Sequence, residues 1–198
     1  PASKGARLDG AGVHLQAGSV VTAAACRVYG NEADGAGGGF YATNSTLVLD
    51  ATQVFSNRAA HTNGLGDGGG IAAYRSALQF GAGTEIRQNV AFRSGGGVFL
   101  KDATAVLDGS TIAFNVASND GGGLATAGFS NLVASSTWIA DNAAGYGGGA
   151  ALFGGLVDGT ATFYNVTAEN NLARNGGGAF YVDSDACLRL RGGVLIGN

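Results

Sequence analysis

The side chains best suited to chemistry in this sequence are carboxylates and arginines that recur at fixed distances from Gly-Gly-Gly triplets. Five residues after each triplet stand Asn44, Arg75, Asp102, Gly128, Gly154 and Asp183. If the triplets stack, Arg75 and Asp102 become neighbours, and acidic and basic groups that share one face can catalyse glycan cleavage. The simpler interpretation is a surface ion pair worth about 0–1 kcal/mol.

Two further carboxylate arrangements fit the same chemistry only loosely. Asp50 and Asp108 share a position two repeats apart, about 10 Å at the usual strand spacing, with Gly81 between them. An inverting glycosidase pair could span that distance, but no third group accompanies it. The densest charged cluster consists of Asp183, Asp185, Arg189 and Arg191. We therefore expect no catalytic residues and keep a carbohydrate-active domain as the alternative.

The motifs for cofactors and metals are incomplete. Gly64–Gly69 fits G-x-G-x-x-G, but no helix follows to hold a pyrophosphate at its N-terminus. His14 and His61 have no Cys or His nearby in sequence, and Asp67 and Asp120 lack the companion oxygens that Ca²⁺ requires. The sequence predicts neither a cofactor nor a metal.

Two N-glycosylation sequons begin at Asn44 and Asn165. Their number is what chance gives for this composition, and both would be exposed acceptors in a secreted eukaryotic protein. Cys26 and Cys187 fall in the first and last repeats, about 25–30 Å apart if the repeats stack. That separation is too large for a disulfide.

The element that must position these groups is a repeat. Asn-x-Ala is followed by Gly-Gly-Gly six times, with 26–31 residues between successive triplets. The repeated asparagines are Asn31, Asn57, Asn89, Asn115, Asn142 and Asn171. A fixed period of this length indicates stacked coils. Asn tolerates the left-handed conformation of a tight corner, and identical amides on successive coils can form a hydrogen-bonded ladder.

Apolar residues alternate with polar ones around each asparagine, which predicts strands and not helices. We expect an all-β fold, a right-handed parallel β-helix of about seven coils with three short strands per coil. Residues 1–198 would form one domain, with an irregular first coil over 1–27 and regular coils over 28–198. The last residues repeat the asparagine motif without a cap, so we expect a fragment of a longer chain.

An uncharged row stands two positions after the triplets. It contains Tyr41, Ala72, Phe99, Ala125, Ala151 and Phe180. A strand that faced water would carry charges here, so the row is expected to be covered. Either a kinked triplet turns these residues inward, or Tyr41, Phe99 and Phe180 form an interface with another domain or copy.

Composition limits the partners. Only 13% of the 198 residues are charged and the net charge is −3, which excludes an electrostatic nucleic-acid partner. No apolar run is long enough to insert in a membrane as a helix.

The joint pattern of an apolar residue, x-x-Asn-x-Ala and Gly-Gly resembles the repeats of the chlamydial polymorphic membrane protein family. Those repeats are written Phe-x-x-Asn and Gly-Gly-Ala-Ile, and the best copy here spans residues 168–181. The resemblance covers roughly residues 28–198. It implies an extracellular or cell-surface β-helix that serves adhesion. We therefore expect a non-catalytic module for adhesion or assembly, whose partners are other parts or copies of the parent protein, surface glycans or proteins.

Overall fold

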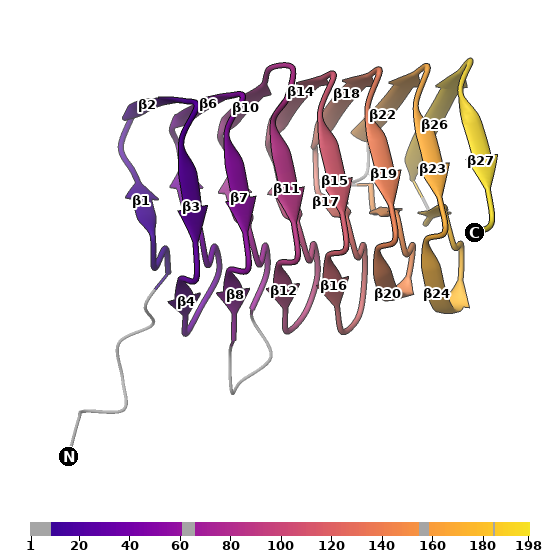
Figure 1. Cartoon of the computed structure of the whole chain (residues 1–198), viewed down its shortest axis with the longest axis horizontal. Coiled ribbons are helices and arrows are strands. Elements are labelled where there is room, and N and C mark those ends of the chain that lie inside the picture. Colours follow the sequence, from indigo (N-terminus) through magenta and orange to yellow (C-terminus); the bar gives the residue numbers. More distant parts are fainter. Residues whose placement is uncertain (1–8, 61–65, 155–158, 184) are drawn as a thin grey trace.

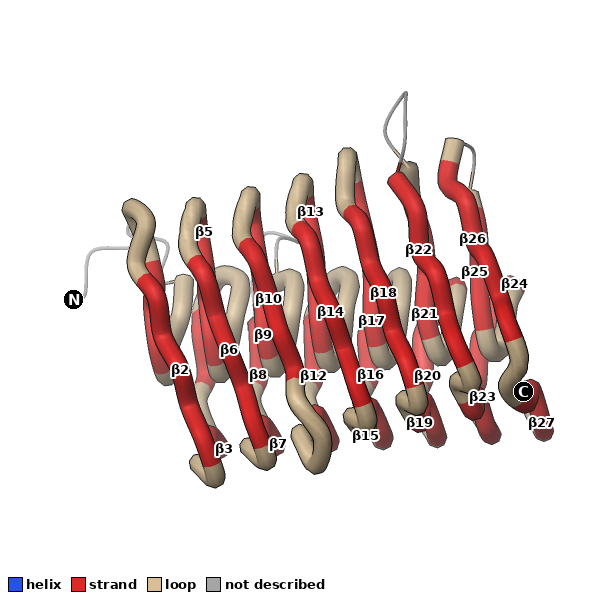
Figure 2. Tube along the Cα trace, turned by 90° about the horizontal axis from the view of Figure 1, so that it is seen from above, coloured by secondary structure: helices blue, strands red, loops and turns tan. Residues whose placement is uncertain are grey.

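The chain winds into a parallel β-helix, seen in a computed structural model that describes residues 9–60, 66–154, 159–183 and 185–198. Every paired strand is parallel to the equivalent strand of the next coil, and three sheets have seven strands each (Figures 1 and 2). Strands β1 (Val13–Leu15) and β27 (Val194–Ile196) lie at opposite ends of the stack (Figure 1).

The first sheet, sheet A, consists of β1 (Val13–Leu15), β5 (Phe40–Thr43), β9 (Ile71–Tyr74), β13 (Val98–Lys101), β17 (Leu124–Ala127), β21 (Ala150–Leu152) and β25 (Phe180–Val182). Sheet B consists of β2 (Val20–Ala24), β6 (Thr46–Asp50), β10 (Ala77–Phe80), β14 (Thr104–Asp108), β18 (Asn131–Ser135), β22 (Gly159–Tyr164) and β26 (Ala186–Arg191). Sheet C consists of β3 (Arg27–Tyr29), β7 (Gln53–Phe55), β11 (Glu85–Arg87), β15 (Thr111–Ala113), β19 (Trp138–Ala140), β23 (Thr167–Glu169) and β27 (Val194–Ile196).

A fourth sheet of six strands, sheet D, adds a strand beyond the three expected to every described coil except the last. It consists of β4 (Glu32–Ala33), β8 (Arg58–Ala59), β12 (Val90–Ala91), β16 (Val116–Ala117), β20 (Ala143–Tyr146) and β24 (Leu172–Gly176). Most of these strands have two residues, too few for an alternating pattern to show in the sequence. Sheet D projects from the stack as a ledge along one side (Figure 1).

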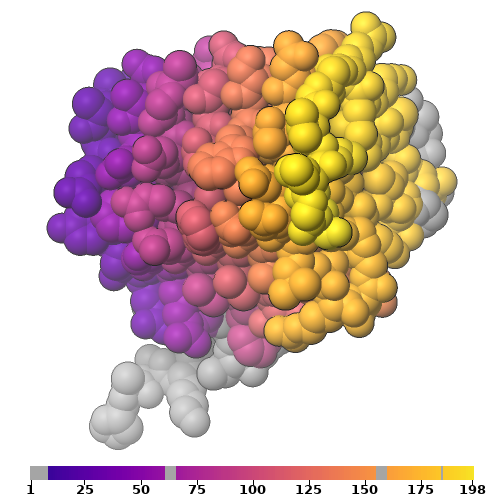
Figure 3. All heavy atoms as spheres, turned by 45° about the vertical axis from the view of Figure 1, so that its right-hand side comes forward, coloured from indigo at the N-terminus to yellow at the C-terminus, as the bar shows by residue number. Residues whose placement is uncertain are grey.

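The core lies between sheets A, B and C and is built from columns of apolar side chains. In sheet B, for example, Leu47, Leu78 and Ala105 are in register, as are Leu49, Phe80 and Leu107. All six are buried, because alternate residues of a strand point to the same face. In the space-filling view the coils form adjoining bands of colour (Figure 3).

The glycine triplets belong to a short segment that we call the glycine arm, which runs from the residue before each triplet to its end. The arm packs against sheet D of the next coil at backbone distance. A Cβ on Gly122 would lie 2.5 Å from the carbonyl oxygen of Gly148 and 2.6 Å from the backbone nitrogen of Ala143. Only glycine permits this approach, so the triplets are needed to stack the ledge.

The repeated asparagines form the expected ladder. The Nδ2 of each donates to the Oδ1 of the next from Asn31 through Asn171, and Asn198 accepts the last bond, with distances of 2.8–3.1 Å. The Oδ1 atoms also accept the backbone N–H of the preceding asparagine in the ladder. Asn115 is fully buried by these contacts.

The left-handed corner residue differs from the expectation. None of the ladder asparagines has a positive φ; the residue before each one does. These residues are Gly30, Ser56, Gln88, Phe114, Asp141, Asn170 and Gly197, with φ between 51° and 68°. The asparagine side chain is instead required for its hydrogen bonds, since it supplies a donor and an acceptor to neighbouring coils.

In the last coil, the backbone conformation of the triplet and the strand that follows it are shifted by one residue toward the C-terminus relative to the earlier coils. Gly177, with φ of 70°, takes the place that the first triplet glycine holds in earlier coils, and Gly176 belongs to β24. Phe180 is consequently paired with Ala150, and Tyr181 with Ala151. The predicted row therefore ends in Tyr181, and Phe180 belongs to the adjacent, core-facing row.

The first coil is more regular than expected. Val13–Leu15 pairs in register with Phe40–Ala42, and Val20–Ala24 pairs with Thr46–Asp50, so residues 13–24 are a coil like the others. In its core-facing positions Val21 and Ala23 stand where the next coil has Leu47 and Leu49, and these smaller side chains obscure the pattern in the sequence.

Candidate functional site

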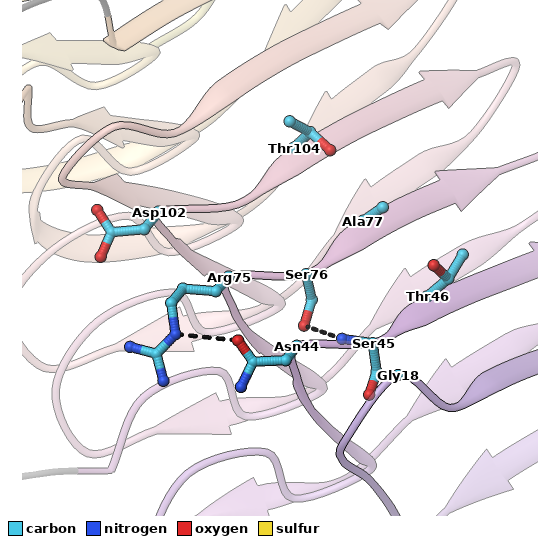
Figure 4. Close-up of a pocket in the computed structure, with 9 residues that line it drawn as sticks. All are labelled: Gly18, Asn44, Ser45, Thr46, Arg75, Ser76, Ala77, Asp102 and Thr104. Atoms are coloured by element: carbon cyan, nitrogen blue, oxygen red, sulfur yellow. Dashed lines mark hydrogen bonds between the residues drawn. The ribbon is translucent and has the colours of Figure 1, made fainter.

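Arg75 and Asp102 occupy successive left-handed corners between sheets A and B, with φ of 49° and 52°. They do not form the predicted ion pair. Arg75 Nε donates to Asn44 Oδ1 at 3.1 Å (Figure 4). Asp102 Oδ1 accepts the backbone N–H of Phe129 at 3.0 Å. Each side chain is held by a polar group of an adjacent coil.

A shallow hollow of about 470 Å³ lies beside these corners. Its lining is polar and consists mainly of hydroxyl, amide and charged side chains (Figure 4). The serines at its base are fixed, because Ser76 Oγ accepts the backbone N–H of Ser45 at 3.1 Å and donates to the carbonyl of Tyr74 at 2.9 Å. The hollow offers one guanidinium and one carboxylate to a polar ligand.

The other predicted charged groups are spread over the surface. Asp108 accepts a hydrogen bond from Ser135 at 2.6 Å. Asp183 does not take the left-handed conformation of Arg75 and Asp102; Asp185, which directly precedes β26, has φ of 64° instead. Arg191 lies over the ring of Tyr164, 5.9 Å from its centroid.

A polar network that the sequence did not predict lies beside the outer face of sheet A. Its centre is Asp67, whose side chain is 1% exposed. Arg93 holds this carboxylate with two contacts, Nε to Oδ1 at 2.7 Å and Nη2 to Oδ2. The hydrogen bond that Arg93 donates to Asp67 is the main cause that raises the pKa of Arg93 above its usual value, so the guanidinium stays charged.

Ser94 links this pair to Asp120. Its backbone N–H donates to Asp67 Oδ1 at 3.3 Å, and its hydroxyl donates to Asp120 Oδ2 at 3.0 Å. Burial raises the pKa of Asp120, and the hydrogen bond from Ser94 and the charge of Arg93 only partly offset this effect. Asp67, Ser94 and Asp120 directly precede the triplets of three successive coils. An isolated parallel β-bridge between Ser94 and Asp120 holds the second and third of these residues side by side.

Aromatic rings continue this surface in both directions along the stack. Tyr41, Tyr74 and Phe99 follow one another at centroid distances of 5.5 and 5.7 Å. Beyond the alanines of β17, Tyr146 and Tyr181 lie 4.9 Å apart. The charge of Asp183 is the main cause that raises the pKa of Tyr181. Tyrosines, the partly buried Asp120 and the exposed Asp183 thus lie along the outer side of sheet A.

The predicted interface row is covered by the chain itself. Phe99 is only 4% exposed, and Ala72, Ala125 and Ala151 are fully buried. The glycine arm passes over them, since a Cβ on Gly95 would lie 2.8 Å from that of Phe99. The row points outward, as the interface hypothesis required, but Phe99 is not available to a partner. Phe180 lies in the core-facing row, and Tyr41 remains partly exposed.

The incomplete metal and cofactor motifs noted in the sequence are only partly placed by the structure. Among the described residues no three His, Cys, Asp or Glu side chains gather as metal ligands. Asp67 is paired with Arg93, while His61 and the start of the Gly64–Gly69 motif lie outside the described residues. Within the part of the chain that is described, no helix could cross a membrane.

Both sequon asparagines are exposed at left-handed corners, Asn44 with φ of 48° and Asn165 with φ of 50°. The free thiols of Cys26 and Cys187 are also exposed.

The position before the triplets would have revealed the network to a column-by-column comparison. It contains Ala36, Asp67, Ser94, Asp120 and Tyr146. An alignment of the repeats on their asparagines hides the relation between Asp67 and Ser94. The second repeat has extra residues between its asparagine and its triplet, so only an alignment on the triplets puts Asp67 and Ser94 at the same position.

One family model matches most of the chain. Its description is a right-handed β-helix region, and the match covers residues 11–194. No curated protein and no solved structure gives a significant match.

Proposed function

The chain belongs to the right-handed β-helix family, and we propose that it serves as a non-catalytic binding module of a surface or secreted protein. Its ligand would be an extended glycan that lies along the outer side of sheet A. The observation that supports this proposal is the line of tyrosines and polar groups across successive coils. A surface that repeats every coil, about 4.8 Å, suits a polymer better than a compact metabolite.

The chemistry of that side is suited to sugars. Tyr146 is 37% exposed and pairs with Tyr181, so both rings can contact the C–H face of a pyranose. Asp183 is exposed on the same coil as Tyr181, and Lys101 is exposed on β13. These groups can form hydrogen bonds with hydroxyls. The resemblance of the repeats to polymorphic membrane proteins favours a role in adhesion at the cell surface.

A glycan-cleaving enzyme is the second candidate, and Asp120 favours it. A partly buried carboxyl with a raised pKa can act as a general acid, and Asp183 contributes to the field that raises it. Against this role, Asp120 is bound to Ser94, and the neighbouring Asp67 is committed to Arg93.

Calorimetric titration with soluble β-glucan, pectin and alginate oligosaccharides tests the binding proposal. We expect one of these classes to bind, and Tyr181→Ala to weaken its affinity by at least tenfold. Tyr29→Ala is the control, because Tyr29 is 59% exposed on sheet C, away from the proposed surface. Equal losses from both changes, or no binding to any class, would contradict the proposal.

Product analysis with the same polymers separates the two candidates. We expect no new reducing ends and no unsaturated uronate from the wild-type protein. Cleavage that Asp120→Asn abolishes while binding persists would establish the enzyme.

A further inference from the structure

We propose that the outer face of the sheet D ledge is a dimer interface, on which a second copy of this chain packs face to face with its coil axis reversed. The six ledge strands lie side by side below the strands of sheet C (Figure 1). The proposed glycan surface lies on sheet A, so the two surfaces are separate and each can be tested without the other.

The ledge presents alternate side chains of each strand to the outside. In the four middle coils the ladder asparagine and the alanine two positions after it are buried, and the residues that flank them face outward. The pairing register aligns the residues between asparagine and alanine in one column. This column contains Glu32, Arg58, Val90, Val116, Ala143 and Leu172. It is apolar over four successive coils, although Val90 and Val116 are each 41% exposed.

Two exposed phenylalanines flank these valines at the centre of the ledge. Phe114 is 51% exposed and Phe92 is 48% exposed. Phe114 also has φ of 57°, and its equivalent is glycine or a polar residue in every other described coil. A bulky apolar ring in a left-handed conformation at the surface is unfavourable for the isolated chain, so a contact outside the chain would account for it.

The two central coils carry no charge on this face. Their outward residues are Gln88, Val90, Phe92, Phe114, Val116 and Ser118. Exposed aromatic and aliphatic side chains without charge among them are typical of the centre of a protein interface.

The charges lie toward the two ends of the ledge and have opposite signs. Glu32 and Asp34 make the first strand and its end acidic, and Arg174 makes the last strand basic. Nearer the centre, Arg58 lies on the second strand and Asp141 lies beside the fifth. A two-fold dimer brings the same surface of both copies together, so the face must complement itself. Reversal of the coil axis achieves this, because each acidic group then meets the basic end of the other copy.

One register satisfies both the charges and the apolar centre. If a two-fold axis runs parallel to the ledge strands between β12 and β16, β4 of one copy faces β24 of the other and β8 faces β20. Asp34 of each copy then lies opposite Arg174 of the other, and Arg58 lies next to Asp141. At the axis Val90 of each copy faces Val116 of the other. In this register no charged residue of the ledge is opposite a like charge.

The area of the ledge fits a weak, reversible dimer. The outward segment of each coil is about five residues long, or roughly 17 Å, and six coils about 4.8 Å apart span roughly 29 Å. The two faces together would therefore bury about 1,000 Å², which is at the lower end of specific interfaces. We expect a dissociation constant in the micromolar range.

Sedimentation velocity over a range of concentrations tests the proposal. The wild-type chain should pass from monomer to dimer, and Val116→Lys should raise the dissociation constant at least tenfold, because each lysine would meet apolar side chains at the axis. Val106→Lys is the matched control, because Val106 is 48% exposed on sheet B and its change should leave the dimer intact. Circular dichroism verifies that both variants remain folded. A wild-type monomer well above micromolar concentration, or equal effects of the two lysines, would overturn the proposal.

The variant Phe114→Asn separates contact with a second copy from a role in the fold. Asparagine tolerates the left-handed conformation better than phenylalanine does, so at concentrations where the wild type is monomeric the variant should unfold at the same temperature or higher. The same change should weaken the dimer severalfold, because the ring is lost from the interface. A less stable monomer with an unchanged dimerisation constant would assign the ring to the fold and contradict the interface.

A charge exchange tests the reversed arrangement. Asp34 and Arg174 are five coils apart, about 24 Å within one copy, so strong coupling between them must arise between copies. Asp34→Arg alone and Arg174→Asp alone should each weaken self-association severalfold, because each puts like charges opposite one another. An equimolar mixture of the two variants should form a heterodimer with much of the wild-type affinity, since every opposed pair in it has opposite signs. A mixture that associates no better than either variant alone would rule out the reversed register.

Discussion

Asp67 carries a carboxyl group that is almost completely buried. Its side chain is 1% exposed and bound by Arg93, whose own side chain is 35% exposed. A buried carboxylate is tolerated only when its partners replace the water it has lost. Ser94 supplies a further backbone donor, so the network depends on three successive coils being in register.

Removal of Arg93 should therefore be costly. We expect Arg93→Ala to lower the free energy of unfolding by about 3–5 kcal/mol, because Asp67 would remain buried without its cation. Arg58→Ala is the comparison, since Arg58 and Glu32 are 3.7 Å apart and both side chains are more than half exposed. That change should cost at most about 1 kcal/mol. Urea unfolding measures both, and similar losses would show that the Asp67 contact adds little.

Asp120 should make stability depend on pH in the opposite sense from a salt-bridged carboxylate. Its pKa is raised in the folded state, so the folded protein binds the proton more tightly than the unfolded chain does. The resulting penalty is complete above the folded pKa and disappears as the pH falls toward the ordinary value of 3.8.

The variant Asp120→Asn isolates this effect, because the amide oxygen can still accept the hydrogen bond from Ser94. Asp120→Asn should be more stable than the wild type near neutral pH, and the difference should shrink as the solution is acidified. Thermal unfolding at several pH values measures it. A difference that stays constant with pH would assign the effect to packing.

Two adjacent glycines of the last triplet, Gly176 and Gly177, have different structural roles. Gly177 has φ of 70°, and an added Cβ would meet the carbonyl of Phe180. Gly176 has no positive φ, and its nearest neighbour would be Tyr146 at 4.0 Å. The two adjacent residues thus differ in both space and conformation.

Alanine substitutions test this difference. Gly177→Ala should destabilise the protein by about 2 kcal/mol or more, through left-handed strain and the contact with Phe180. Gly176→Ala should change stability by no more than about 0.5 kcal/mol. Thermal unfolding measures the stability of both variants. If Gly176→Ala were the more destabilising change, the last coil would have the register that the glycine count suggests.

The regularity of the repeat explains which predictions from the sequence were correct. The coil period, the asparagine ladder and the apolar columns repeat identically, so their spacing sufficed. The displacement of Phe180 could not be predicted, because Gly176 and Gly177 are indistinguishable until backbone conformation is known. The Asp67–Arg93 pair was missed because its partners come from different coils and from different positions in the repeat.

At the largest scale the described part of the chain is a one-dimensional assembly, in which the paired strands of each sheet come from adjacent coils. An interior coil is bonded on both sides and a terminal coil on one. The core is correspondingly less shielded at the end of the stack, where Leu195 is 54% exposed while its equivalent Ile139 in the interior is 1% exposed.

This connectivity determines how the protein would respond to mechanical force. Strands β1 and β27 lie at opposite ends of the stack, so tension applied through the first and last described coils acts on one of these coils at a time (Figure 1). Each coil of 26 or so residues would release about 90 Å of extended chain when it peels away. Single-molecule stretching should therefore give a series of small, evenly spaced steps in place of one large rupture. Such a module would lengthen gradually under load and keep its remaining coils folded.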